Sequence, residues 1–334
     1  MAIAIGRIFA IAASVAIVVG LLVPTSAWIF YEDDRRPSHS VMVGRLEVKL
    51  PQGTASGTAA LVDECGILTN FHVVFGPWYV TTFRAPSREF WGTFTLTEAM
   101  LPDGTHPSAR AIPVTWGEYL GPDRQLRVPD HDWAYLVLDR CLGLEYGHFQ
   151  LHELDLEDLK EPLGGFAALG YSTGKQMLDP ACFVHAARSQ TGNEAWLHDC
   201  ALEAGDSGGP IIKRGTSALV ALGASIVANP GDPGCPSGGL RYKGVPLAQL
   251  SIHCANVAVP LTRDTIERVQ VAHIATAVQR MLNELGYDAG PLGAIDGPRA
   301  IAAIKEVQRD MAWPVTGEPT HSLWKILRLK TLMS

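Results

Sequence analysis

The sequence has no run of basic residues, and its formal net charge over 334 residues is −7. Proteins that bind nucleic acid concentrate Lys and Arg in one segment or on one face, so this composition argues against a nucleic-acid partner. No group of His, Cys, Asp and Glu has convincing metal-ligand spacing once the cysteines are considered separately. We therefore expect no metal and no cofactor.

Cysteine is also scarce, with six residues in the whole chain. An even number of cysteines fits an oxidising compartment and a set of disulfides. Proximity in the sequence favours the pairs Cys65–Cys141, Cys182–Cys200 and Cys235–Cys254. The alternative is a zinc site built from Cys182, His185, His198 and Cys200.

The first 27 residues carry a single charge, Arg7, followed by the apolar run Ile8–Val23. Small residues at 25–27 then precede Trp28, an order typical of a secretory signal peptide at residues 1–27. The apolar run is short for a helix that spans a membrane. We expect export, with an uncleaved membrane anchor as the alternative, and a polar linker at residues 28–39.

Few windows before residue 260 have a helical period. Short apolar or alternating runs are instead separated by Gly, Pro and Asp, which predicts a mainly β domain built as a barrel or sandwich. The clearest candidate strands are Val41–Leu50, Gly57–Val62, Gly66–Thr69, Trp133–Leu138, Ile211–Ile212 and Leu219–Val227.

The segment Ala204–Pro210 places a serine among glycines, just before an apolar pair. Gly205 lets the backbone turn its N–H toward a substrate oxygen, where a β-carbon would hinder the turn. The N–H groups of Gly205 and Ser207 are therefore candidates for an oxyanion hole. Ser207 is the candidate nucleophile.

A serine nucleophile needs a base and an acid. His72 follows the strand Gly66–Thr69 and a polar turn, and we take it as the base. Asp132 begins an apolar strand, and we take it as the acid. Asp130 is the alternative, since it lies two residues earlier and on the same face of the strand.

Three segments of the chain resemble landmarks of the trypsin/chymotrypsin-like serine proteases. They are the Gly-Asp-Ser-Gly-Gly-Pro stretch ending at Pro210, the turn Thr69–His72 and the start of the strand at Asp132–Leu136. Their order along the chain, His72, Asp132, Ser207, is the order in that family. The resemblance covers residues 40–262. It implies a chymotrypsin-like double β-barrel and a peptide or protein substrate.

In trypsin-like relatives, the residue six before the nucleophile forms the floor of the specificity pocket. Here that residue is Ala201, which argues against a preference for Lys or Arg. The segment also resembles the glutamyl endopeptidases, but Leu202 and Ser225 occupy the places of the Thr and His that bind a glutamate. We expect a small or apolar residue before the scissile bond. In the digestive relatives, the aspartate that matches Asp206 pairs with a newly cut N-terminus, but no matching Ile-Val-Gly-Gly start is present here.

After Leu261 the pattern becomes helical. Thr265–Leu285 carries apolar residues at 271, 274, 278, 282 and 285, and Gly286 follows as a C-terminal cap. A second helix is expected with Ile301, Ile304 and Val307 facing inward. Thr320 is the expected cap of a third helix.

Residues 270–330 resemble the three-helix peptidoglycan-binding domain of bacterial cell-wall enzymes. The resemblance rests on motifs around Val278–Tyr287, Gly297–Arg299 and Val315–Gly317. The usual Asp-Gly pair of the loop is Gly293-Ala294 here, and the Thr expected after Arg299 is Ala300. Binding to peptidoglycan through residues 264–334 is one interpretation, and a tethering or regulatory helical module is the other.

The sequence thus predicts four parts: a signal peptide at 1–27, a linker at 28–39, a protease domain at 40–262 and a helical domain at 263–334. The expected function is that of an exported serine endopeptidase, periplasmic or extracellular, held near the cell wall. The alternative is a catalytically silent adaptor on a protease scaffold. A cell-wall hydrolase would need paired carboxylates or a metal site, and the sequence offers neither at convincing spacing.

Overall fold

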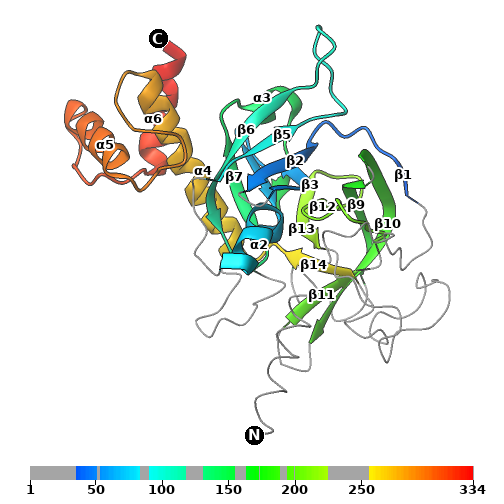
Figure 1. Cartoon of the computed structure of the whole chain (residues 1–334). Coiled ribbons are helices and arrows are strands. Elements are labelled where there is room, and N and C mark those ends of the chain that lie inside the picture. The colour runs from blue at the N-terminus through cyan, green and yellow to red at the C-terminus, as the bar shows by residue number, and fades with distance from the viewer. Residues whose placement is uncertain are drawn as a thin grey trace, which may run out of the picture.

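The computed structural model describes residues 35–50, 53–82, 90–117, 131–154, 163–172, 174–188, 194–198, 200–224 and 256–333. The expected signal peptide, most of the linker, and Asp130, Ser225 and the Cys235–Cys254 pair lie outside these residues. Within them, no helix is both long enough and apolar enough to cross a membrane. Two β units stand beside each other, and the first of three C-terminal helices runs along one of them, with the other two helices beyond it (Figure 1).

The first unit is a closed barrel with the strand order β2-β3-β4-β7-β6-β5. Each strand pairs antiparallel with its neighbours. Closure leaves no exposed sheet edge. The strands are β2 (Val43–Leu50), β3 (Gly53–Leu61), β4 (Gly66–Thr69), β5 (Gly92–Thr95), β6 (Ser108–Trp116) and β7 (Ala134–Leu138).

The second unit is an eight-stranded sheet with the path β1-β10-β11-β14-β13-β12-β9, and β8 pairs with β13. An additional pairing between β9 and β10 joins the last strand of this path to its second strand. The strands are β1 (Arg36–Pro37), β8 (Gln150–Leu151), β9 (Leu163–Ser172), β10 (Lys175–Arg188), β11 (Glu194–His198), β12 (Pro210–Lys213), β13 (Ala218–Ala224) and β14 (Asn256–Pro260).

Strand β7 packs into two apolar cores, one on each of its faces. Its residues alternate between two faces. Leu136 and Leu138 fill the barrel interior with Leu46 and Phe94. Tyr135 and Val137 point outward, into a core shared with the second sheet and the first C-terminal helix; that core includes Leu219, Leu222, Val259, Val269 and Ala272. A strand buried on both faces needs an uninterrupted apolar sequence.

Two helices lie within the β region, α2 (Phe71–Thr82) and α3 (Leu142–Tyr146). We expected only a polar turn before His72, so α2 is a feature that the sequence pattern did not indicate. Phe71, Val73, Val74 and Phe75 are all buried. With consecutive residues buried, the helix has almost no amphipathic period to recognise.

The C-terminal helices are α4 (Arg263–Glu284), α5 (Pro298–Asp310) and α6 (His321–Met333). As expected, Thr320 accepts a hydrogen bond from the Leu323 N–H at 3.2 Å. Gly286 follows α4 with φ +89°. The helices enclose their own core of Val278, Leu282, Ile304, Val307, Leu323 and Leu327.

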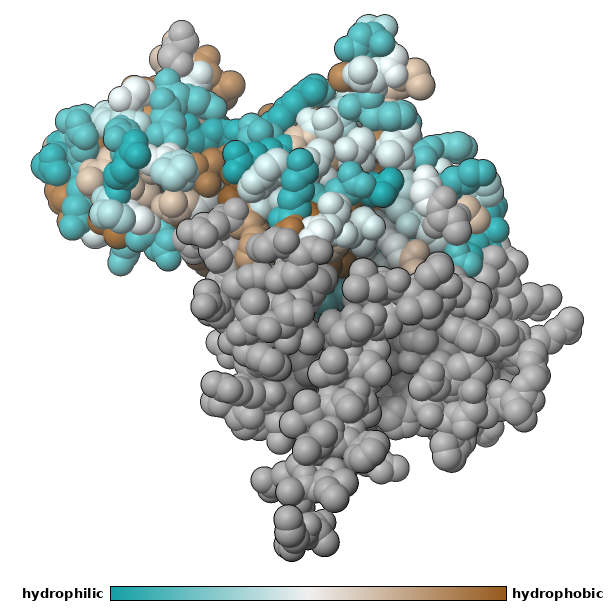
Figure 2. Space-filling view, viewed as in Figure 1, coloured by the Kyte–Doolittle hydropathy of each residue, from teal (hydrophilic) through white to brown (hydrophobic). Residues whose placement is uncertain are grey.

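Two expectations about the helical stripes were wrong. Val271 and Ile301 are 65% and 36% exposed, whereas the buried positions nearby are Ala272, Ala300 and Ala303. Close packing of helices favours the small alanine side chains at these contacts. The exposed apolar residues Leu329, Leu332 and Met333 lie at the C-terminal end of α6, where Figure 2 shows hydrophobic side chains.

The two cysteine pairs in the described residues are disulfides, Cys65–Cys141 and Cys182–Cys200, as proximity predicted. The first joins the β3–β4 turn to the start of α3 in the first unit, and the second joins β10 of the second sheet to Cys200, which follows β11. The alternative zinc site is wrong, because a disulfide consumes the two thiolates that would bind the metal.

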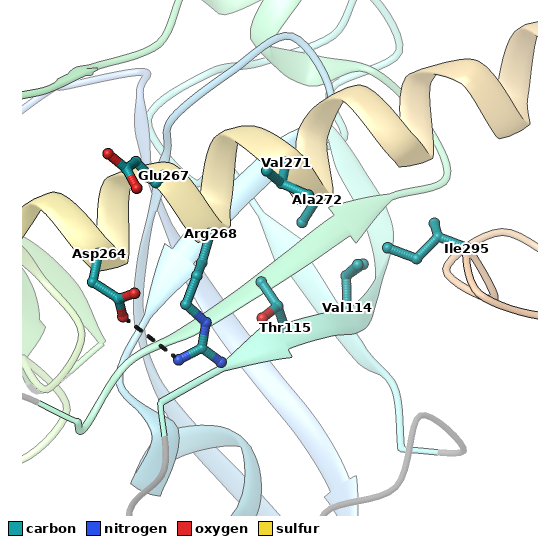
Figure 3. A pocket seen from close by; sticks show the side chains of 8 residues that line it. All are labelled: Val114, Thr115, Asp264, Glu267, Arg268, Val271, Ala272 and Ile295. Carbon is teal, nitrogen blue, oxygen red and sulfur yellow. Dashed lines mark ion pairs between the residues drawn. The ribbon is translucent and has the colours of Figure 1, made fainter. Parts of the chain in front are cut away.

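Helix α4 joins the helical domain to the outside of the barrel (Figure 1). The Arg268 guanidinium donates to the Trp116 carbonyl at 2.6 Å and lies 4.9 Å above the Trp133 ring. Beside it is a cavity of about 370 Å³ between α4 and β6. Figure 3 shows Arg268 reaching from α4 toward β6, with Asp264 in an ion pair at 3.9 Å.

Candidate active site

The structure brings His72 and Asp132 together at one end of the barrel. Strands β4 and β7 pair through Thr69 and Ala134, so the residues after β4 meet the residues before β7. Asn70 donates its side-chain N–H to the Asp132 carbonyl at 2.8 Å. Helix α2 begins directly afterwards and presents His72 in its first turn.

Asp132 holds His72 through both of its carboxylate oxygens. One oxygen accepts the His72 backbone N–H at 2.9 Å, and the other lies 2.7 Å from Nδ1 of the ring. This arrangement fixes the imidazole so that Nδ1 carries the proton toward the carboxylate. Nε2 is then the nitrogen left to act as a base.

The two side chains differ in exposure, with 28% for His72 and 3% for Asp132. Burial of the ring lowers the pKa of His72, but the charge of Asp132 and its hydrogen bond outweigh this, so the pKa is raised above 6.5. A base with a raised pKa accepts a proton more readily in a reaction near neutral pH.

Ser207 lies in the turn between Leu202 and β12. Gly205 has φ +104° and Gly208 has φ +85°, a backbone conformation that favours glycine. Thr58 on β3 fixes this turn, since its Oγ1 donates to the Gly205 carbonyl at 2.8 Å and its N–H donates to the Ser207 carbonyl at 2.9 Å. The turn is therefore attached to the first barrel.

Gly57 shows how near Ser207 lies to the histidine helix. A Cβ built on Gly57 would be 2.8 Å from both Cγ atoms of Val73 and 2.9 Å from the Ser207 carbonyl oxygen. Val73 is the residue after His72, so one glycine separates the two candidate catalytic segments. Among the described residues, no hydrogen bond yet joins Ser207 Oγ to His72, and such bonds commonly tighten only when substrate binds.

The backbone N–H groups around Ser207 divide into two sets. Those of Asp206, Gly208 and Gly209 donate to the carbonyls of Glu203, Gly223 and Asp206. Those of Gly205 and Ser207 donate to no acceptor among the described residues. Two N–H groups kept without an internal acceptor in a rigid turn are suited to binding a developing oxyanion.

Two of the three residues expected to select the substrate are buried, and the third, Ser225, lies outside the described residues. Ala201 and Leu202 are 2% and 3% exposed, and Leu202 packs in an apolar core with Ile211 and Val220. The Ala201 N–H donates to Asp179 at 2.8 Å. Their role in specificity stays a prediction. Over the part of the chain described, no group of three His, Cys, Asp or Glu side chains is placed to hold a metal ion.

Sequence reasoning missed one contact of this site. The Arg35 guanidinium, in the polar segment that we expected to be a linker, lies 3.2 Å from Asp206 and 3.0 Å from Glu203. The signal in the sequence was an arginine within the charged run 32–36, which by itself indicates no partner.

Two family models match the chain. Residues 57–222 match "Trypsin-like peptidase domain", and residues 275–327 match "Putative peptidoglycan binding domain". The chain thus contains a trypsin-like peptidase domain, built on the closed barrel and the second sheet, followed by a domain of the peptidoglycan-binding family. This identification confirms the two resemblances that the sequence motifs indicated.

Three solved structures match part of the chain at low sequence identity. A Glu endopeptidase in complex with MPD has 15% identity and a TM-score of 0.49, over 73% of this chain and 99% of that chain. The protease Anisep from Arthrobacter nicotinovorans has 12% identity and a TM-score of 0.43, over 68% and 93%. The HtrA-type protease AlgW with a tripeptide has 17% identity and a TM-score of 0.43, over 70% and 63%. No curated protein matches the chain.

Proposed function

We propose that the chain is an exported serine endopeptidase in which Ser207 is the nucleophile, His72 the general base and Asp132 the residue that orients it. The observation that supports this best is the short Asp132–His72 contact beside a turn whose Gly205 and Ser207 N–H groups have no acceptor among the residues that the structure describes. The trypsin-like peptidase domain supplies the fold on which this chemistry is known.

In the proposed reaction, Ser207 Oγ attacks the carbonyl carbon of a peptide bond while His72 Nε2 takes its proton. The Gly205 and Ser207 N–H groups donate to the oxyanion, each contributing about 3–4 kcal/mol in comparable sites. His72 then gives the proton to the departing amine, which leaves an acyl group on Ser207. Water, activated by His72, hydrolyses this ester and restores the hydroxyl. Asp132 stabilises the imidazolium throughout.

For the substrate, we keep the proposal of a small or apolar residue before the scissile bond. Ala201 places no carboxylate at the pocket floor and Leu202 no hydroxyl. A library of peptides cleaved by the full-length protein tests this directly. Dominant cleavage after Arg, Lys or Glu would refute the proposal.

We also propose that the helical domain holds the enzyme at peptidoglycan. The family match at residues 275–327 supports this, and the two disulfides fit an oxidising compartment outside the cytoplasm. The full chain carrying Ser207→Ala should co-sediment with insoluble peptidoglycan. A protein that stays in the supernatant would instead favour the tethering or regulatory interpretation.

A fluorophosphonate probe, which reacts with activated serines, distinguishes the peptidase from the catalytically silent adaptor. The wild-type chain should be labelled and should cleave peptides. Ser207→Ala should lose labelling and lower turnover by about a million-fold, as removal of the nucleophile does in other triads. Ser322→Ala, an exposed serine on α6, is the matched control and should react as the wild type does. Labelling that persists in Ser207→Ala would contradict the assignment.

A further inference from the structure

Arg35 is a buried cation in a segment where the sequence suggested only solvent-exposed charges. Its side chain is 5% exposed, and the carboxylates of Asp206 and Glu203 beside it are 3% and 14% exposed. The guanidinium also donates to the Ser172 hydroxyl at 2.9 Å. A charge buried this deeply is retained only where its partners are well placed, because the cost of removing it from water is large.

The chain around Arg35 is attached to the second sheet by backbone hydrogen bonds. Strand β1 pairs antiparallel with β10, matching Arg36 with Leu178. The Ser38 N–H donates to the Gln176 carbonyl at 3.1 Å. The Gln176 side chain accepts the Ser40 N–H at 2.7 Å and donates to the Ser40 carbonyl at 2.9 Å. These contacts fix the backbone that carries the guanidinium, which lowers the entropy lost in placing it.

The two carboxylates that Arg35 binds belong to Glu203 and Asp206, the first and last residues of the turn that contains Gly205. Asp206 accepts the Glu203 N–H at 2.7 Å through the oxygen that also faces Arg35. The Asp206 N–H donates in return to the Glu203 carbonyl at 3.0 Å. Two like charges in one tight turn repel each other, and the planar guanidinium between them compensates both at once. Ser207 follows Asp206 directly.

We propose that Arg35 is a positioning residue for the Glu203–Ser207 turn, so that this N-terminal segment sets the geometry of the nucleophile and of its two N–H donors. The inference rests on the proposed function for its catalytic consequence. Because the contact uses a side chain, and because arginine stays charged at all physiological pH values, the turn is fixed whether or not the residues before Arg35 are removed. The turn then requires no newly formed chain terminus.

The test compares Arg35→Met with Arg36→Met in the full chain. Arg36 is the matched control, because it directly follows Arg35, begins β1 and has an exposed side chain. Arg35→Met should slow fluorophosphonate labelling by at least about tenfold, a partial loss compared with the roughly 100- to 1,000-fold cost of removing one oxyanion donor. The decrease should appear in kcat more than in KM, since the N–H donors act mainly in the transition state. Arg36→Met should label at the wild-type rate.

Hydrogen exchange gives a second readout that does not depend on activity. Amides of residues 203–209 should exchange faster in Arg35→Met than in Arg36→Met, while amides of the first barrel remain unchanged. Equal labelling and equal exchange in the two variants would overturn the proposal. If the wild-type chain shows no labelling that depends on Ser207, the proposed function fails, and exchange alone still decides whether Arg35 positions the turn.

Arg35→Lys keeps the test decisive if Arg35→Met does not fold. Lysine keeps the charge but cannot bind two carboxylates and a hydroxyl through one planar group. A labelling rate of Arg35→Lys between those of wild type and Arg35→Met supports the proposal. If Arg35→Met does not fold, a labelling rate of Arg35→Lys below that of wild type supports it. A wild-type rate and wild-type exchange in Arg35→Lys would show that the bidentate contact does not position the turn.

Discussion

Two largely buried histidine–aspartate pairs occur in the part of the chain that the structure describes, and they lie in different surroundings. At the candidate active site, Asp132 is 2.7 Å from His72. At the joint between barrel and helical domain, Asp63 is 3.2 Å from His273 on α4. In both pairs, burial lowers the pKa of the histidine, and contact with the carboxylate outweighs it and raises the pKa.

The neighbours of each pair decide what it can do. His72 lies beside the Ser207 turn and its two N–H groups. Asp63 also accepts the Tyr135 hydroxyl at 2.8 Å and the Cys65 N–H at 2.9 Å, and the Trp324 ring lies 6.5 Å from that of His273. The second pair thus lies within a packed contact between two domains. A histidine held by an aspartate is therefore not enough to identify a catalytic site.

The largest expected difference between the pairs concerns activity. Asp132→Asn should lower kcat/KM by about 10⁴-fold, because an amide does not hold the His72 tautomer that accepts the serine proton. Asp63→Asn should change kcat/KM by less than about twofold, since it lies outside the site. Steady-state cleavage of one peptide by both variants measures this. A tenfold or smaller loss in Asp132→Asn would show that the pair at the candidate site is also only structural.

The sequence predicted the first pair but not the second. Strand Gly66–Thr69 matches its expected bounds, and the apolar run after Asp132 is a strand, so the ends that carry His72 and Asp132 were recognisable. Asp63 and His273 belong to a turn and a helix more than two hundred residues apart. Arg35 and Asp206 are separated by 171 residues. Contacts between distant polar residues leave no period in the sequence, so pattern alone could not pair them.

The next effect concerns how firmly the joint holds the helical domain. Arg280 on α4 donates to the carbonyls of Leu138 and Asp139 at the end of β7. Arg280→Met should destabilise the protein by about 1–2 kcal/mol, because both carbonyls lose a charged donor. Arg263→Met is the control on the same helix: its ion pair with Glu153 is largely exposed, and the expected change is below about 0.5 kcal/mol. Urea unfolding, followed by tryptophan fluorescence, measures both, and equal midpoints would contradict the assigned role of Arg280.

The smallest effect separates the two pairs by their response to pH. Activity should rise as pH increases through the raised pKa of His72, since only the neutral ring accepts the serine proton. The His273–Asp63 contact should change in the opposite direction.

The pKa of His273 lies above 6.5, through the hydrogen bond and charge of Asp63 and the charge of Glu64, despite burial and the opposing charge of Arg328. Its stabilising contribution is therefore complete below pH 6.5 and is lost as pH rises through the pKa of the folded protein. The pKa of Asp63 is lowered, because contacts with His273, Cys65 and Tyr135 outweigh burial. The stability that the Asp63 carboxylate contributes is therefore lost only as pH falls below about 4. The difference in unfolding free energy between wild type and His273→Ala should be about 1 kcal/mol near pH 5.5 and shrink toward pH 9. His321→Ala removes the other ring against Trp324 without touching Asp63, and it is the control for the loss of ring packing. A constant difference for His273→Ala across this range would mean that the joint depends on the packing of the ring and not on its charge.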